Sequence, residues 1–407
     1  MRVVLFFICL SMLGNAASIK LKEGSYRGVI VLNESENREL PFNIEVKYKG
    51  KRPIIIFRNA DEKIVVDEIT VKGDSINFKM PVFDTEFRTK VLDGNWSGVW
   101  INHYKTSNNI LTFKTEYNET RRFKLPEERL APDFEGNWET TFSPNSDKIS
   151  KAIGVFHHVE QSDFLSGTFL TETGDYRYLE GMRSGNQLYL SCFDGNHAYL
   201  FTAKYDGKKL IGDFYSGSSY HEAWEAVRND NFKLGNADEI TFMKDKNAVI
   251  QFSFPNISKQ VVSLSDKKYA GKVTIIQVMG SWCPNCMDES VYLSELYKQY
   301  NNKGLEIIGL AFEKTNDFET SSARLKRLKE RLKVEYELLV TQQTGKEKAS
   351  EVLSALNNIV AFPTTLYLNK QHQVVKIHTG FSGPATGKAY EDFKQSTEKL
   401  IQKLLQE

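Results

Sequence analysis

The sequence predicts a multidomain protein in which an antiparallel β-rich N-terminal region precedes a C-terminal α/β domain. Up to about residue 228, short runs rich in Val, Ile, Phe and Tyr are separated by turn signals such as Asp93-Gly94 and Asp194-Gly195. After Asn236, strand-like and helix-like stretches alternate, as in βαβ units. The 407 residues suffice for two or three domains of about 100 to 200 residues each. We expect the N-terminal region to contain two related units, arranged as a barrel or a sandwich.

The first residues, 1–17, have the pattern of a secretory signal peptide: Arg2, an apolar run, and small residues before a cut after Ala16. The apolar run is shorter than the roughly 20 residues of a membrane-spanning helix. Cys9 lies inside this run and not at the cut, so we expect it to be removed and not lipidated. These features predict an exported, periplasmic protein whose mature chain has no transmembrane segment.

The composition excludes some classes of function. The 53 Lys and Arg residues balance 52 Asp and Glu residues, so the chain lacks the basic bias of nucleic-acid binding proteins. The mature chain would keep three cysteines, Cys192, Cys283 and Cys286. A disulfide scaffold needs more cysteines than this, so hydrophobic burial must stabilise the fold.

Residues 24–128 and 132–230 are expected to form the two β-rich units. Segments such as QLYLSCF (187–193) alternate apolar and polar residues, as half-buried strands do. The stretch INFKMPVFDTEF, followed by DGNWSGVW, resembles LYLSCFDGNHAYLF, followed by DGKKLIGDF, at an offset of roughly 110 residues. Cys192 alternates in phase with Leu188 and Leu190, which predicts a buried, unreactive thiol. The alternative is a third redox cysteine that holds the Cys283 and Cys286 pair in a mixed disulfide.

Residues 238–407 are expected to form the α/β domain, with a largely parallel sheet. VTIIQVMG (273–280) and LEIIGLAF (305–312) are nearly continuous apolar runs, typical of strands covered on both faces. Further helices are expected near 320–332 and 345–356, and two amphipathic helices have apolar stripes. The stripes consist of Leu293, Leu296, Tyr297 and Tyr300, and of Tyr390, Phe393, Thr397, Leu400, Ile401 and Leu404. For the basic residues of SSARLKRLKERLK we expect a solvated helix face and not a membrane contact.

The stretch GSWCPNCMDE (280–289) places two cysteines where a buried strand meets a helix. Pro284 suits the first helical position, so Cys283 lies at a helix N-terminus, where the dipole favours a thiolate. We expect Cys283 to be the exposed nucleophile and Cys286, one turn further on, to be the buried resolving thiol. Glu289 lies on the same helical face and can accept a proton if burial raises its pKa. The alternative is a solvated glutamate in the first turn.

From about residue 239 to its end, the chain resembles the TlpA-like (ResA-like) branch of exported, thioredoxin-fold thiol–disulfide oxidoreductases. The resemblance rests on LSDKKYAGKVTIIQVMGSWCPNC, on the following Met-Asp-Glu and on AFPTTLYL (361–368). It implies a redox-active disulfide between Cys283 and Cys286, proton transfer assisted by Glu289, and no cofactor besides the dithiol. It also implies a cis Pro363 facing the disulfide, where the alternative is a trans proline opening an edge strand. The implied substrate-binding residues are Trp282, Pro284, Phe362, Pro363 and Thr364.

The same resemblance implies protein disulfides as substrates and a membrane thiol carrier of the CcdA or DsbD type as electron donor. Three residues depart from the pattern, and one of them, Val291, stands where the family often has proline. Gln277 stands where thioredoxin has a buried aspartate, which moves the role of base toward Glu289. Asn285, before the second cysteine, replaces the proline of many relatives. The segment DFYSGSSYHEAWEAVRND (213–230) resembles β-rich extensions of TlpA-like proteins of the Bacteroidetes type.

Other functions fit less well. A zinc site needs about four ligands, and the histidines show no paired ligand spacing, so no metal is expected. An inert structural disulfide does not explain Trp282 and Pro284 around the pair. A peroxidase would have Thr or Ser and then Pro before its cysteine, where this chain has Gly280-Ser281-Trp282. The remaining alternative is a surface ligand-binding or glycan-binding protein whose α/β domain is accessory.

Overall fold

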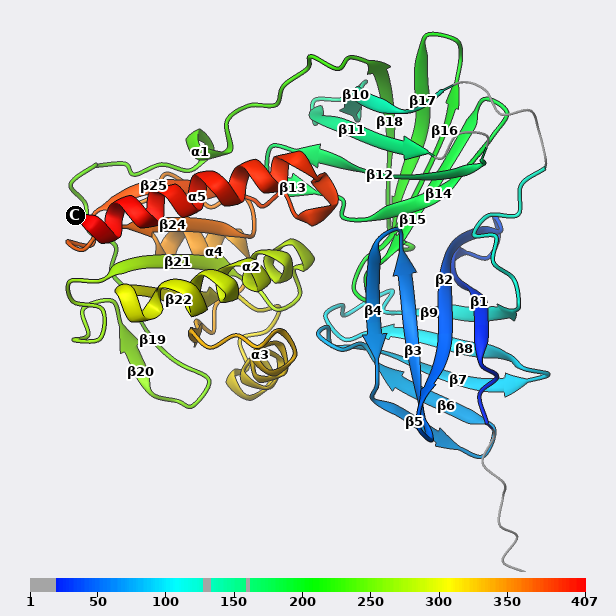
Figure 1. The fold of residues 1–407 in the computed structure, drawn as a ribbon, viewed down its shortest axis with the longest axis horizontal. Helices are drawn as coiled ribbons and strands as arrows, with labels where there is room; N and C mark the ends of the chain where they lie inside the picture. Colours follow the sequence, from blue (N-terminus) through cyan, green and yellow to red (C-terminus); the bar gives the residue numbers. More distant parts are fainter. Residues whose placement is uncertain (1–19, 127–132, 159–161) are drawn as a thin grey trace, which may run out of the picture.

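The computed structural model describes residues 20–126, 133–158 and 162–407 (Figure 1). The expected signal peptide, with Cys9, lies outside the described residues. The β structure of the N-terminal region lies on one side of the C-terminal α/β domain (Figure 1). Within the described residues, no helix is long and apolar enough to cross a membrane.

The first β unit is one nine-stranded antiparallel sheet with the order β4-β3-β2-β1-β9-β8-β7-β6-β5. Its first and last strands, β1 and β9, pair at the centre of the sheet. The strands are β1 (Gly24–Asn33), β2 (Arg38–Lys49), β3 (Arg52–Asn59), β4 (Glu62–Val66), β5 (Ile69–Lys72), β6 (Ser75–Lys79), β7 (Thr85–Leu92), β8 (Asn95–Asn102) and β9 (Ile110–Tyr117).

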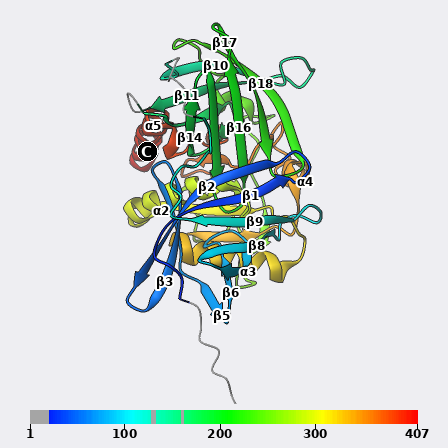
Figure 2. The same ribbon diagram turned by 90° about the vertical axis from the view of Figure 1, so that its right-hand side faces the viewer.

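The second β unit is also a nine-stranded antiparallel sheet, with the order β11-β10-β18-β17-β16-β15-β14-β12-β13. β12 pairs with both β14 and β11, so this sheet closes into a barrel. Its strands run across those of the first sheet (Figure 2). They are β10 (Gly136–Phe142), β11 (Ser150–His158), β12 (Phe164–Thr171), β13 (Gly174–Asp175), β14 (Leu179–Ser184), β15 (Gln187–Phe193), β16 (Ala198–Tyr205), β17 (Lys209–Ser216) and β18 (Tyr220–Arg228).

The two β units share one strand order. In each unit, the first strand lies between the second strand and the last. From the last strand, the order then descends to the fifth strand of the unit. The repeated sequence segments fall on β6, β7 and β8 in the first unit and on β15, β16 and β17 in the second. The units differ in closure, because the described part of the first sheet lacks a pairing between its third and fifth strands. The common strand order supports the expectation that the two units are related. Each unit forms its own sheet.

The C-terminal domain is built on a five-stranded sheet with the order β23-β22-β21-β24-β25. β21, β22 and β23 are parallel, whereas β24 and β25 run antiparallel to their neighbours. The expectation of a largely parallel sheet is therefore correct for only three strands. The connection between β24 and β25 is too short for the crossover that a parallel pair requires. The strands are β21 (Val273–Met279), β22 (Leu305–Ala311), β23 (Glu337–Val340), β24 (Thr364–Leu368) and β25 (Val374–Thr379).

Helices cover both faces of this sheet. The buried side chains of α2, α3 and α5 share one core with Ile275 and Ile307, and α4 packs with Ile276 and Ile308 on the other face. α4 ends four residues before the expected Leu356, which instead forms a bridge with Met243. The remaining elements are α1 (Ala237–Ile240), β19 (Ser253–Pro255), β20 (Val261–Ser263), α2 (Pro284–Tyr300), η1 (Asn301–Lys303), α3 (Phe318–Leu332), α4 (Gly345–Val352), η2 (Pro384–Thr386) and α5 (Lys388–Gln406).

The basic side of α3 is not the solvated face that the sequence suggested. Arg324 donates to Asp84 at 2.9 Å, and Arg327 and Arg331 pair with Glu68. Both acidic residues belong to the first β unit, so these arginines dock the unit against α3. The spacing of charges along a helix does not reveal such a contact, because the partners lie more than two hundred residues away in the chain.

A second contact joins the second β unit to the α/β domain near the end of β25. Gly380 has φ +82°, and a Cβ atom there would lie 2.2 Å from the carbonyl carbon and oxygen of Thr173. Thr173 lies in the turn between β12 and β13. Only a residue without a side chain permits this approach of two backbones.

Gly380→Ala should therefore destabilise the protein more than the same change at Gly207, which has φ +98° and no atom near its Cβ position. Backbone strain at Gly207 should cost about 1–2 kcal/mol. At Gly380 the displaced Thr173 backbone should add about 1–3 kcal/mol. Urea unfolding of both variants measures the difference, and equal losses would show that the contact does not form.

Candidate active site

The cysteine motif lies at the junction of β21 and α2. Cys283 is the N-cap of α2, Pro284 opens the helix as predicted, and the N–H of Cys286 donates to the Cys283 Sγ at 3.2 Å. Cys283 and Cys286 form a disulfide, with 5.2 Å between their Cα atoms. This position directs the N–H groups and the dipole of the helix at Cys283 Sγ, which stabilises a thiolate after reduction.

Glu289 is fully buried beneath the disulfide-bearing turn, so a solvated glutamate is the wrong description. Thr365 Oγ1 donates to its Oε1 at 2.7 Å, and Gln277 Nε2 donates to its Oε2 at 2.8 Å. Burial raises the pKa of Glu289 to about 7, although these two hydrogen bonds oppose the shift. Gln277 Nε2 also lies 3.3 Å from the carbonyl oxygen of Cys286, which links the carboxyl group to the resolving cysteine. A carboxyl group with this pKa can both accept and return a proton near neutral pH.

The Phe362–Pro363 peptide bond is cis and lies beside the disulfide. Cys283 Sγ is 3.5 Å from the carbonyl oxygen of Phe362, and the Phe362 ring meets the Trp282 ring edge-on at 5.6 Å. β24, which follows the proline, pairs on both sides and is not an edge strand. The Thr364 side chain is fully buried, and its hydroxyl donates to the Ala361 carbonyl. Its expected role in substrate binding stays a prediction.

Cys283 is not the exposed nucleophile that the sequence suggested, because only 5% of its surface is accessible. Residues of both β units contact the backbone on either side of it. The Tyr104 hydroxyl lies 3.4 Å from the Ser281 carbonyl oxygen, and Asn196 Nδ2 donates to the Trp282 carbonyl at 2.6 Å. A helix N-terminus is normally accessible, and here it is covered by chain segments remote in sequence.

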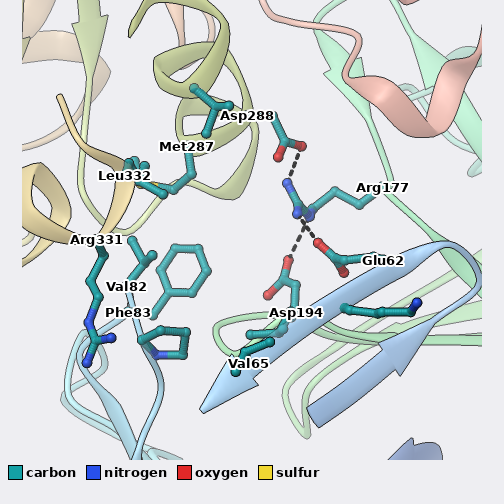
Figure 3. A pocket seen from close by; sticks show the side chains of 14 residues that line it. Glu62, Val65, Val82, Phe83, Arg177, Asp194, Met287, Asp288, Arg331 and Leu332 are labelled. Atoms are coloured by element: carbon teal, nitrogen blue, oxygen red, sulfur yellow. Dashed lines mark hydrogen bonds and ion pairs between the residues drawn. The ribbon is translucent and has the colours of Figure 1, made fainter. Parts of the chain in front are cut away.

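We call the residues of the two β units that contact the N-terminus of α2 the cover. Arg177, between β13 and β14, makes its central contact (Figure 3). Its Nη1 donates to the Pro284 carbonyl at 3.2 Å and to the Asp288 carboxylate. It also pairs with Glu62 of the first β unit and lies 3.6 Å from the Asp194 carboxylate of the second. Burial alone would lower the pKa of Arg177, but the three carboxylates raise it above its usual value. The guanidinium therefore stays charged and joins both β units to the first turn of α2.

The residue between Pro284 and Cys286 is held by the same cover. Asn285 Nδ2 donates to the carbonyl oxygens of Asp175, at 3.2 Å, and of Phe381, at 3.1 Å. The Asp175 carboxylate accepts hydrogen bonds from the N–H groups of Gly383 and Arg177. Burial, with the nearby Asp288 charge, raises the pKa of Asp175 to about 6. Asn285 is thus tied both to the second β unit and to the segment after β25.

Sequence reasoning named the dithiol, the buried glutamate and the cis proline, and missed the groups that hold them. Thr365 carried no separate signal, although it lies inside the motif that contains Pro363. Arg177, Asn196 and Tyr104 lie 75 or more residues before the cysteines and have no motif of their own.

Cys192 is fully buried in the second β unit. Burial, with the nearby Asp194 charge, raises the pKa of its thiol well above its usual value, which favours the expected unreactive thiol. Within the described residues, no group of three or more His, Cys, Asp or Glu side chains is arranged to hold a metal ion.

Comparisons with known proteins concern the C-terminal part of the chain. A model of the Redoxin family matches residues 244–392. The chain is 27% identical to the thiol-disulfide oxidoreductase ResA of Halalkalibacterium halodurans over 118 residues, covering 29% of this chain and 60% of that protein. It is 25% identical to the ResA of Bacillus thuringiensis subsp. konkukian over 140 residues, covering 33% of this chain and 72% of that protein. A secreted thiol-disulfide isomerase from Corynebacterium glutamicum, solved by crystallography, aligns with a TM-score of 0.33 at 16% identity, covering 44% of this chain and 99% of that one.

The C-terminal part of the chain therefore contains a Redoxin domain, and its five-stranded sheet has the thioredoxin fold. The chain spans 60% of the length of the first of these relatives. The matched region includes the two cysteines, Glu289 and Pro363.

Glu289→Gln should change how stability depends on pH. Because burial raises the pKa of Glu289 to about 7, the folded protein binds this proton more tightly than the unfolded chain does. The stabilising contribution is therefore complete below about pH 4.5 and is lost as the pH rises through 7. The stability of the variant relative to wild type should rise by roughly 3 kcal/mol over that window. Urea unfolding between pH 4.5 and 8.5 measures it, with Glu319→Gln as an exposed control. Parallel pH curves for wild type and Glu289→Gln would contradict the assignment.

Arg177→Met should destabilise the docked arrangement strongly. The change leaves the Glu62, Asp194 and Asp288 carboxylates close together without their shared cation. Loss of one partner from a buried ion pair costs about 3–5 kcal/mol. Arg88→Met removes an exposed arginine and should cost less than about 1 kcal/mol. Chemical denaturation compares the two variants, and similar losses would rule out a central role for Arg177.

Proposed function

We propose that the protein is an exported thiol–disulfide oxidoreductase that reduces protein disulfides through Cys283 and Cys286. The observation that carries this proposal is the Cys283–Cys286 disulfide at the N-terminus of α2, above a buried Glu289 whose pKa is about 7. The Redoxin match and the ResA relatives support the same chemistry. The contacts of Cys283 and Trp282 with Phe362 support a substrate groove that these residues form with Pro284 and Pro363.

The reaction begins with the reduced dithiol. The Cys283 thiolate attacks one sulfur of the substrate disulfide, which forms a mixed disulfide and releases the other substrate sulfur as a thiolate that takes a proton. Cys286 then passes its proton to Glu289 and attacks the Cys283 sulfur. The enzyme disulfide forms, the second substrate thiol leaves, and the substrate has gained two electrons.

Each turnover leaves the enzyme oxidised, so a thiol reductant must restore the dithiol. In an exported protein the reductant would be a membrane thiol carrier of the CcdA or DsbD type. The signal-peptide pattern of the first 17 residues supports the export that this route requires.

Single cysteine variants should separate the roles of the three thiols. With insulin as substrate and dithiothreitol as electron source, Cys283→Ser should reduce the rate to the uncatalysed level, because the attacking thiolate is missing. Cys286→Ser should accumulate a mixed disulfide with the substrate, detectable by intact mass. Cys192→Ser is the control and should keep the wild-type rate. Activity in the Cys283→Ser variant would contradict the mechanism. Ligand binding that survives replacement of both Cys283 and Cys286 by serine would favour the binding-protein alternative.

A redox titration in thiol buffers should establish the direction of electron flow. A potential at or below roughly −250 mV would agree with a reductant, whereas one above roughly −180 mV would make the protein an oxidant or isomerase. Alkylation of Cys283 and Cys286 follows the titration, and the Cys192→Ser variant removes the background of the third thiol.

A further inference from the structure

A cavity of about 290 Å³ lies beside Trp282, where both β units meet the Redoxin domain. Asn102 Nδ2 donates to Asn196 Oδ1 at 2.9 Å, and Asn196 in turn donates to the Trp282 carbonyl. The amide groups thus hold the walls together. The cavity is lined by Trp100, Asn102, Tyr104, Lys105, Asn196, His197, Ala198, Ser216, Gly217, Trp282 and Lys314.

Two lysines supply positive charge to this cavity. Lys314 Nζ lies 3.7 Å from the centre of the Trp282 ring, and Lys105 is half-buried next to Gly217. Within the described residues, neither ammonium group makes a hydrogen bond or an ion pair. Burial lowers the pKa of both lysines, and at Lys314 the nearby Glu313 charge opposes the shift.

The acidic groups nearest to the cavity are already engaged. The Asp194 carboxylate pairs with His197 and faces Arg177. Glu313, beside Lys314, accepts hydrogen bonds from the N–H and the hydroxyl of Ser281, and burial raises its pKa. Neither carboxyl group therefore neutralises the two ammonium groups.

Trp100 supplies part of the aromatic wall of this cavity. Trp100 is 2% exposed, and its Nε1–H has no acceptor within the described residues. The cavity therefore combines two ammonium groups with aromatic walls, and it suits an anion carried on a larger ligand.

We propose that this cavity binds a carboxylate of the disulfide substrate, held by Lys105 and Lys314, while the adjacent disulfide meets Cys283. This inference rests on the proposed function, because Trp282, which lines the cavity, directly precedes the reacting Cys283 in the chain. The substrate class is a disulfide with a carboxylate close to its sulfur atoms. Such a group occurs in an acidic segment flanking a protein cysteine and in a small disulfide such as glutathione disulfide.

The first test compares two disulfide-linked peptides that differ only in Glu or Gln beside the cysteine. The reduced wild-type chain should show a kcat/KM roughly tenfold higher for the Glu peptide, because an ammonium–carboxylate contact replaces a neutral one. In the Lys105→Gln/Lys314→Gln double variant the ratio should fall to about one. Lys267→Gln is the control, since Lys267 is exposed and outside the cavity, and it should keep the wild-type ratio.

Glutathione disulfide and its ethyl ester form the second substrate pair and separate the two sources of the carboxylate. A preference only in the peptide pair assigns the cavity to acidic protein segments, and a preference only in the glutathione pair assigns it to small disulfides. Equal rates within both pairs, or preferences that survive the double variant, would overturn the proposal.

A binding measurement keeps the inference separate from the proposed function. S-methylglutathione and its diester cannot react with the cysteines, and tryptophan fluorescence of the oxidised chain reports their binding. Tighter binding of the free acid that disappears in the double variant would support the cavity even if no disulfide were reduced, in which case only the proposed function would fail. If reduction fails and the acid and the diester bind equally, both proposals are wrong.

Discussion

The Arg177 guanidinium lies where the two β sheets meet the first turn of α2, and the geometry of the cysteine motif depends on it. One cation faces carboxylates from both β units and from α2, and it also donates to the Pro284 carbonyl inside the motif. Without this cation the buried Asp194 and the partly buried Glu62 and Asp288 carboxylates would repel one another, so the charge stabilises the three parts of the chain together. The N-terminal region is thus part of the active-site structure and more than an appendage to a Redoxin domain.

A second constraint acts below the disulfide. Glu289 is surrounded by β21, β24 and α2, and its carboxyl group is satisfied by one amide and one hydroxyl, with no cation in contact. Burial without a cation raises the pKa, whereas a lysine or arginine at the same distance would lower it. The replacement of the aspartate of thioredoxin by Gln277 fits this arrangement, because two buried carboxyl groups at that spacing would compete for one proton.

The cover has a consequence for substrate access. A bare thioredoxin-like domain presents its first cysteine at a helix N-terminus, but here Cys283 is nearly inaccessible and its neighbours bind residues of both β units. The same contacts create the cavity beside Trp282, which would not exist in the C-terminal domain alone. Under the proposed function, the N-terminal region limits which disulfides reach Cys283 and supplies charges that distinguish among them.

The sequence alone determined the features that follow from local rules. The apolar strand and the proline that begins α2 predicted the dithiol geometry, and the i, i+3 spacing placed Glu289 on the face of Cys286. The cis bond before Pro363 was implied only by the family resemblance. Only the tertiary structure decided that Cys283 is covered, that the arginines of α3 dock to the first β unit, and that Arg177 lies beside Pro284. Hydrophobic periodicity and capping act over a few residues, whereas the contacts between the β units and the C-terminal domain named here join residues 86 or more positions apart. Such pairings depend on how three folded parts fit together, which no local pattern encodes.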